Sequence, residues 1–95
     1  MSDPALLILS SLAGGDKHGY AIMEDVETFA HVRLGPGTLY GAISRLEQTG
    51  WIRPVGTDAR RQSYRLTAAG QAHLRSQLAQ LEKIVRTAGK RLQTA

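Results

Sequence analysis

The residues best suited to chemistry lie in segment 35–50, where a small polar surface surrounds a single basic side chain. At helical spacing one face of this segment has no acid at its centre and carries Gly37, Thr38, Gly41, Ser44, Arg45 and Gln48. Such a face approaches a nucleic-acid groove closely and contacts base edges or the backbone. Arg45 suits a bidentate contact to guanine, and a phosphate contact fits it equally well. A solvated helix face is the simpler alternative, and this segment alone does not decide between them.

The same segment carries signals for both ends of a helix. Pro36 suits the first helical position, where its missing N–H group costs no hydrogen bond, and Gly35 is an acceptable N-cap. Gly50 suits the left-handed residue that follows a helix. The face opposite the polar one is apolar and consists of Leu39, Ala42, Ile43 and Leu46. We therefore predict a helix between Pro36 and Gly50 with one buried face and one face free to bind.

Two strands joined by a basic turn are predicted after this helix. Residues 51–55 read as a strand, residues 56–61 as a turn with Arg60 and Arg61 at its tip, and residues 62–66 as a returning strand. Helix, strand, basic loop and strand is the order of a winged helix-turn-helix, so the predicted fold is mainly α with a small β-wing. In that fold the helix enters the major groove, and the two wing arginines contact phosphates or the minor groove.

Three aromatic residues lie within the predicted helix and wing. Tyr40 lies at the edge of the polar helix face, where its hydroxyl group reaches a phosphate while its ring packs. Tyr64, in the returning strand, is expected to anchor the wing in the core. Trp51, the one tryptophan, opens the first wing strand and is expected in the core, with a ligand-facing position as the alternative.

The first helix is expected to start at Asp3 and Pro4 and to stop at Gly14. It is apolar around most of its circumference, and such a helix is covered on more than one side. We therefore assign Leu6 and Leu9 of this helix to contact with a second subunit.

A second helix is predicted over residues 19–29, opened by residues 16–18. Its inner face is expected to hold Ile22, Met23, Val26 and Phe29, and its outer face Glu24, Asp25 and Glu27. Residues 31–34 then alternate as a very short strand does.

Nothing interrupts a helix between Thr67 and Gly89, and its apolar residues follow a heptad pattern. These residues are Leu74, Leu78, Leu81, Val85, Ala88 and Leu92. Such a helix is about 40 Å long, which exceeds what a small winged domain covers, so the seam is expected to pair with a second chain. Packing against the first helix is the alternative, and both arrangements can hold at different points along it. The chain is thus divided into a winged-helix unit, 1–66, and a dimerisation helix, 67–95.

Composition narrows the classes of function. The 95 residues have no cysteine, which excludes disulfides and thiolate chemistry, and the three histidines, His18, His31 and His73, lack metal-ligand spacing. No nucleophile–base pair, catalytic carboxylate pair or phosphate-binding loop is present, so we expect neither an enzyme nor a cofactor or metal site. The net charge of +4 is unevenly distributed, because the first thirty residues carry a charge of −4 and residues 31–95 carry +8. A basic half on this motif is an electrostatic footprint for nucleic acid. No leader or membrane span is read from the sequence, so a cytoplasmic location is expected.

Several short motifs together resemble those of the PadR family of bacterial and archaeal winged-helix transcription regulators. They are His18-Gly19-Tyr20, Pro36-Gly37-Thr38-Leu39-Tyr40, Arg45 to Ile52, Arg60-Arg61 and Tyr64 to Gly70. The chain is similar to the short branch of the family, in which one C-terminal helix follows the wing. Two positions depart from the family pattern: Gly35 stands in place of a small polar cap, and Gly41 in place of a common proline. Gly41 either permits close approach of the backbone to DNA or loosens the helix.

The resemblance implies a homodimeric repressor that binds double-stranded DNA and is released by a small-molecule effector. It also places Tyr20 near the DNA, with core packing as an equal alternative. A two-fold dimer is expected to prefer a pseudo-palindromic operator and to bind an effector at the interface of its first and last helices. A protein–protein adaptor is the alternative function, although the recognition helix lacks the acidic or apolar outer face that an adaptor needs.

Overall fold

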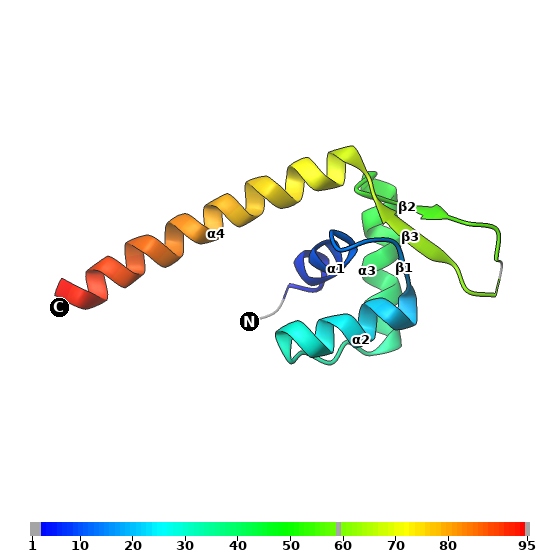
Figure 1. Ribbon diagram of the computed structural model, residues 1–95, viewed down its shortest axis with the longest axis horizontal. Coiled ribbons are helices and arrows are strands. Elements are labelled where there is room, and N and C mark those ends of the chain that lie inside the picture. The colour runs from blue at the N-terminus through cyan, green and yellow to red at the C-terminus, as the bar shows by residue number, and fades with distance from the viewer. Residues whose placement is uncertain (1–2, 59, 95) are drawn as a thin grey trace.

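The computed structural model describes residues 3–58 and 60–94, and it is a mainly helical winged helix followed by a long helix (Figure 1). Three helices come first: α1 (Pro4–Leu12), α2 (Gly19–Ala30) and α3 (Pro36–Thr49). The short strand β1 (Lys17–His18) precedes α2, and the wing is formed by β2 (Ile52–Val55) and β3 (Ser63–Leu66). Helix α4 (Ala68–Thr94) ends the chain. The three antiparallel strands have the order β1-β3-β2, with Lys17 opposite Tyr64 and Pro54 opposite Tyr64 on its other side.

The core lies where α1, α2 and α3 meet the inner side of the small sheet. Each helix contributes one apolar stripe, and the four predicted inward residues of α3 are all buried. The largest fully buried side chains are Ile8, Leu9, Ile22, Val26, Leu39, Ile43 and Ile52. This core holds α3 by one face, so the other face is left to solvent.

The helix ends follow from the residues predicted to form them. The Asp3 carboxylate accepts a hydrogen bond from the Ala5 N–H at 3.0 Å, with Pro4 in the first turn of α1. The His18 ring caps α2, because its Nδ1 accepts a hydrogen bond from the Ala21 N–H at 3.2 Å. Gly50 ends α3 with a φ of 85°, a left-handed conformation that glycine adopts without strain.

Three predictions in the second-helix region were wrong. The third strand is Lys17–His18 rather than residues 31–34, because extended backbone before α2 pairs with β3 while His31 takes a left-handed turn with a φ of 55°. Phe29 is 47% exposed, because the inward stripe of α2 runs through Ile22, Val26 and Ala30. Asp25 is half-buried instead of facing outward, and its carboxylate accepts a hydrogen bond from the Ser11 hydroxyl group at 2.7 Å.

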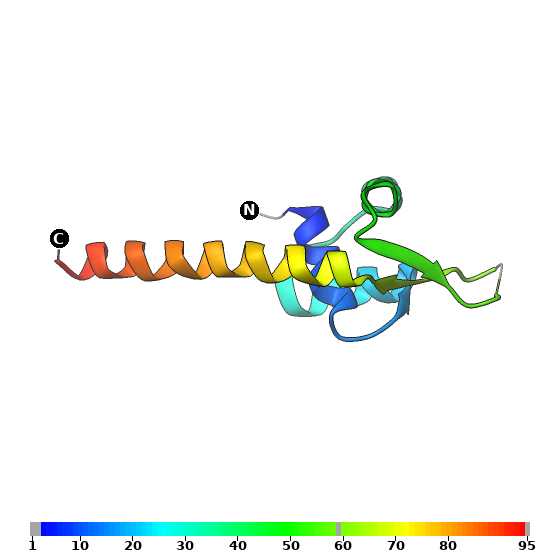
Figure 2. The same ribbon diagram turned by 90° about the horizontal axis from the view of Figure 1, so that it is seen from above.

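Helix α4 starts against the body of the domain and then leaves it, as Figures 1 and 2 show. Its buried residues are Gly70 and Leu74, both in its first two turns. The described part of the chain is 55 Å long and only 26 Å and 20 Å across, because most of α4 has no neighbour. None of the helices in the described ranges combines the length and apolar character needed to cross a membrane.

An ion pair ties the wing to the segment before β1. The Arg65 guanidinium donates hydrogen bonds to both carboxylate oxygens of Asp16, the shortest at 2.7 Å from Nη2. These hydrogen bonds lower the pKa of Asp16 below its usual value of 3.8, and the charges of Arg65 and Arg53 act in the same direction. The pair is solvent-exposed, so its effect on stability is expected to be small.

We expect the variant Asp16→Asn to melt at a lower temperature than the wild type near neutral pH. The pKa of Asp16 is lower in the folded chain than in the unfolded chain, so its carboxylate stabilises the fold above pH 3.8 and loses this effect as the pH falls through the folded-state value. Melting curves at about pH 7 and about pH 3 test this, and the difference between the proteins should shrink at the lower pH. Glu82→Gln on α4 is the charge-matched control. A difference that is unchanged or larger in acid would contradict the prediction.

Candidate nucleic-acid interface

The outer face of α3 is a small polar surface at one side of the molecule. Figure 2 looks along the axis of α3, which lies beside the wing strand β2 and away from the free end of α4. Every residue that the sequence placed on this face is exposed or half-buried: Gly37, Thr38, Gly41, Ser44, Arg45 and Gln48. A Cβ atom added at Gly41 would meet only the Arg45 guanidinium, at 3.8 Å. The helix therefore presents backbone, hydroxyl groups and one long cation with little bulk around them.

The wing carries its two arginines on a tightly connected hairpin. The Gln62 side-chain amide donates to the carbonyl oxygens of Val55 and Ser63, both at 3.0 Å, and so links the two strands near their ends. The Asp58 carboxylate accepts a hydrogen bond from the Arg60 N–H at 3.0 Å and turns the chain at the tip. Ala59 of the predicted turn lies outside the described residues. Arg60 and Arg61 are exposed and extend the basic surface beyond α3.

Between the start of α2, α3 and the wing lies a hollow of about 330 Å³. Tyr20 and Tyr40 contribute to its wall and are 58% and 47% exposed, so the core alternative for Tyr20 was wrong. The Tyr40 ring lies directly over Gly19, where any Cβ atom would collide with it. Gly19 was predicted as the start of a helix and as part of a motif, but its contact with Tyr40 was not predicted, because a glycine at a helix start carries no local signal for a partner 21 positions away.

Tyr64 forms the floor of this hollow and anchors the wing, as the sequence predicted. It is only 8% exposed, and burial, together with the nearby negative charge of Glu47, raises the pKa of its phenol group. The ring therefore stays neutral at physiological pH. Trp51 is half-buried against the core and stacks on His73 of α4, with ring centroids 3.6 Å apart. Trp51 precedes β2 instead of opening it, because the strand starts at Ile52.

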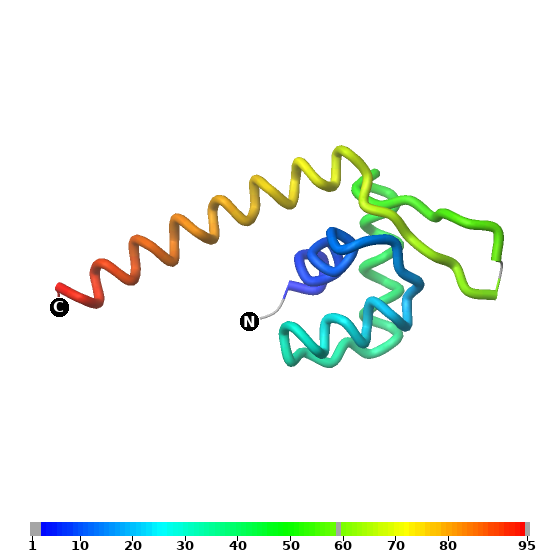
Figure 3. The backbone as a smooth tube through the Cα atoms, viewed as in Figure 1, coloured from blue at the N-terminus to red at the C-terminus, as the bar shows by residue number. Residues whose placement is uncertain are grey.

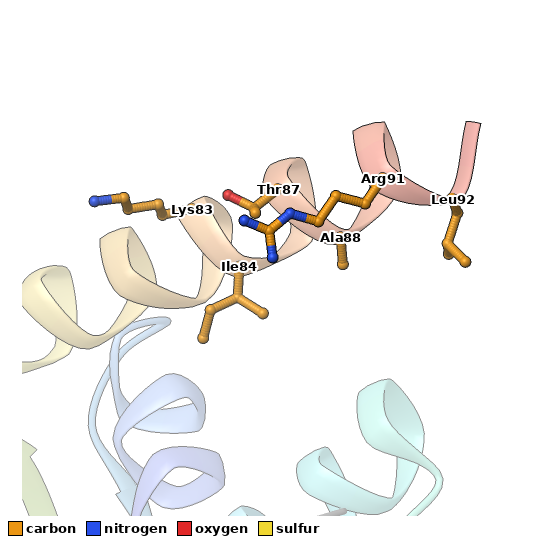
Figure 4. A pocket seen from close by; sticks show the side chains of 6 residues that line it. All are labelled: Lys83, Ile84, Thr87, Ala88, Arg91 and Leu92. Carbon is orange, nitrogen blue, oxygen red and sulfur yellow. The ribbon is translucent and has the colours of Figure 1, made fainter. Parts of the chain in front are cut away.

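The apolar stripe of α4 is a second surface, and it has no partner among residues 3–58 and 60–94. Its exposed side chains range from 40% to 78% accessible and are Leu78, Leu81, Ile84, Val85 and Leu92. Figure 4 shows Ile84, Ala88 and Leu92 pointing to the same side of the helix, along a groove of about 580 Å³. The heptad pattern missed Ile84, because a strict 4–3 alternation steps from Leu81 to Val85. Periodicity every three or four residues would have included it.

Two residues assigned to the dimer contact need correction. Leu9 is fully buried and Leu74 is 5% exposed, and both belong to the core of this chain. They are already covered by neighbouring side chains, so they are not available to a second subunit. Leu6 is partly buried beside the same core. The start of α4 thus follows the intramolecular alternative, and only the part beyond Leu74 is uncovered.

No cluster of three or more histidine, aspartate or glutamate side chains within residues 3–58 and 60–94 has the arrangement of a metal site. The positively charged groups near α3 are arginines on exposed surfaces rather than groups in an enclosed cavity. This arrangement of exposed arginines suits contact with an extended polyanion.

A recognition helix held by one face, with a basic wing beside it, defines a winged-helix DNA-binding protein. The family model of the PadR-like transcriptional regulators matches residues 8–76, and the chain belongs to this family. This is a family of transcriptional regulators and not of enzymes, and its members bind DNA.

Similarity to individual proteins agrees with this assignment. A transcriptional regulator of Mycobacterium tuberculosis is 36% identical over 85 residues, which cover 85% of this chain and 78% of that protein. A 37.1 kDa protein of a Streptomyces fradiae transposon is 44% identical over 70 residues, 74% of this chain, but the chain spans only 20% of that protein's length. The crystal structure of a PadR-family regulator from Clostridium difficile superimposes with a TM-score of 0.83 at 26% identity. The match covers 94% of this chain and 97% of that chain.

Proposed function

We propose that the chain acts as a homodimeric repressor that binds a pseudo-palindromic operator and is released by a small molecule. The observation that carries the DNA-binding part is the outer face of α3, which is polar, unobstructed and centred near Arg45, with its opposite face buried. In this proposal Thr38, Ser44, Arg45 and Gln48 meet base edges or the backbone, while Gly37 and Gly41 let the helix approach closely.

The groups around α3 serve as phosphate contacts in the same proposal. Tyr20 at the start of α2 and Tyr40 on the flank of α3 present hydroxyl groups, and Arg60 and Arg61 extend from the wing. Phosphate contacts of this kind fix the position of a protein on the duplex without reading its sequence. The base contacts of α3 would supply the specificity.

The dimer part of the proposal rests on α4. A row of large apolar side chains exposed over several turns is costly in water, and pairing with a second copy removes it from solvent. The contact would use Leu78, Leu81, Ile84, Val85, Ala88 and Leu92, with Leu6 of α1 at its edge. Two-fold pairing would place the recognition helices in successive major grooves, with half-site centres about 10 base pairs apart or a multiple of that.

Release by an effector requires that the small molecule bind one arrangement of the two recognition helices better than another. The proposed position is beside the α4 groove, whose lining residues all belong to α4, since this surface would lie at the subunit contact. The proposal for release follows from membership of the family and from this placement.

Arginine-to-alanine variants at two positions separate base reading from phosphate binding. Arg45→Ala is expected to lose about 1–3 kcal/mol on the operator and to relax preference at one base pair per half-site. Arg60→Ala and Arg61→Ala should weaken all DNA alike and reduce the salt slope by about one unit each, because each removes one phosphate contact.

The measurement is a titration of fluorescent duplexes at several salt concentrations, with the operator first selected from a random-sequence pool by the wild type. Arg86→Ala, on the outer side of α4, is the matched control and should bind as the wild type does. Equal loss on operator and random DNA would assign Arg45 to phosphate contact. No salt-dependent binding of any duplex by the wild type would favour the adaptor alternative.

A further inference from the structure

The end of the recognition helix is joined to the start of α4 at one corner of the molecule (Figure 3). The Thr67 hydroxyl group donates to the Gly50 carbonyl oxygen at 2.6 Å and accepts from the Gly70 N–H at 3.0 Å. The Thr67 N–H donates to the Trp51 carbonyl oxygen at 3.0 Å, and the Trp51 N–H donates to the Leu46 carbonyl oxygen at 3.0 Å. A continuous set of hydrogen bonds therefore runs from the last turn of α3 to the first turn of α4.

Side-chain packing adds a second connection at the same corner. Gly70 lies so close to the Trp51 backbone that an added Cβ atom would collide with the Trp51 carbonyl oxygen. One turn further along α4, the His73 ring lies flat on the Trp51 indole, with an angle of 11° between the ring planes. The hydrogen bonds hold Thr67, just before α4, and Gly70 in its first turn, and the ring stack holds α4 at His73, one turn further along. Two points of attachment define the direction of a helix, whereas a single point would let the helix rotate about it.

We propose that the Trp51–His73 stack is a positioning pair that sets the angle between α3 and α4, and with it the half-site spacing that a dimer accepts. This inference rests on the proposed function. Beyond Leu74 the described part of α4 is exposed except for the half-buried Gln77, so its direction is decided where it leaves the domain. A tilt of about 5° at the corner displaces the far end of a helix about 40 Å long by roughly one base-pair step of 3.4 Å. A small change in the stack would thus change which spacing fits.

The test compares the affinity of each variant for duplexes with altered spacing. The duplexes carry the two half-sites selected by the wild type, with one base pair inserted or deleted between them. The wild type should bind the altered duplexes roughly tenfold or more weakly than the duplex with the selected spacing, because one extra base pair rotates a half-site by about 34° around the DNA axis. His73→Ala and Trp51→Leu should lose less than about threefold, since a pivoting α4 tolerates the new spacing.

Matched variants separate the stack from general damage. Trp51→Phe keeps a stacking ring and should retain strict spacing, and Gln71→Ala changes an exposed neighbour on α4 and should behave as the wild type. Circular dichroism and melting curves establish that each variant is folded. His73→Leu, which keeps bulk but no aromatic ring, takes the place of His73→Ala if the alanine variant unfolds.

A distance measurement supplies a readout that needs no DNA. The chain has no cysteine, so Gln48→Cys provides a single thiol on each α3 of a dimer to which a spin label can be attached. Electron–electron distance measurements should give a narrow distribution in this background and a broad or shifted one when His73→Ala is added. Trp51 emission should also rise in His73→Ala, because the stacked imidazole ring is removed.

The outcomes distinguish this inference from the proposed function. A wild type that is monomeric or selects no operator overturns both. The inference alone is overturned if the wild type is a dimer that requires one half-site spacing and the His73→Ala and Trp51→Leu proteins require the same spacing. In that case the distance between the spin labels would also be unchanged. Relaxed spacing in these two variants, with strict spacing in Trp51→Phe and Gln71→Ala, supports it.

Discussion

The variant Leu81→Lys is expected to be monomeric at concentrations where the wild type is a dimer, and to bind a palindromic operator about 10²–10⁴-fold more weakly. Leu81 belongs to the exposed apolar stripe of α4 and is 40% exposed in the single chain. A lysine there would place a charge in an apolar contact, where an unpaired charge is strongly unfavourable. A monomer would hold only one half-site, so the gain from binding two linked half-sites is lost.

Sedimentation of both proteins at micromolar concentration checks the assembly, and titration of the selected operator checks the affinity. Ala79→Lys is the matched control, because it adds the same charge to an exposed position of α4 on the side opposite the stripe. It should remain dimeric and bind normally. A wild type that sediments as a stable monomer would remove the dimer from the proposed function.

Two glycine-to-alanine substitutions in α4 are expected to change stability in opposite directions. Gly70→Ala should lower the free energy of unfolding by about 1–3 kcal/mol or more, because its Cβ would collide with the Trp51 backbone and approach the Leu66 side chain to 2.9 Å. Gly89→Ala should raise it by about 0.5–1 kcal/mol, since no heavy atom lies within 4 Å of the added methyl group and alanine favours the helix.

Thermal and urea unfolding at equal protein concentration measure both changes, because the stability of a dimer depends on concentration. For a domain of this size each kcal/mol corresponds to a shift of about 4–8 °C in melting temperature. The two substitutions are chemically identical, so helix propensity alone predicts the same gain for both. A Gly70→Ala protein as stable as Gly89→Ala would mean that the corner between α3 and α4 relaxes without cost.

The two surfaces of the molecule have different physical origins. The face of α3 is defined by what it lacks, since small residues leave the backbone and Arg45 uncovered. The stripe of α4 is defined by what it exposes, since large apolar side chains point into solvent. A DNA-binding role for the first and a pairing role for the second are together sufficient for a symmetric regulator that reads a symmetric site.

Local sequence signals were enough to predict α3, its two faces and the wing that follows it. Pro36 and Gly50 mark the ends of the helix through backbone geometry, and the apolar residues between them recur with the period of a helix. These signals are local, so they can be recognised without knowing any contact between distant residues. For the same reason the polar surface around Arg45 and the basic wing could be placed in the candidate site before the fold was known.

Contacts between distant segments are set by the fold as a whole. Lys17 and His18 form the third strand only because β3 lies beside them, and Tyr40 covers Gly19 only because α3 crosses the start of α2. The division of the α4 pattern into a buried start at Leu74 and an exposed remainder depends on where the domain ends. Trp51 and His73, 22 positions apart, stack because the wing hairpin returns the chain to the end of α3. No local periodicity encodes such pairs, since they arise from packing between elements and not from the conformation of either one.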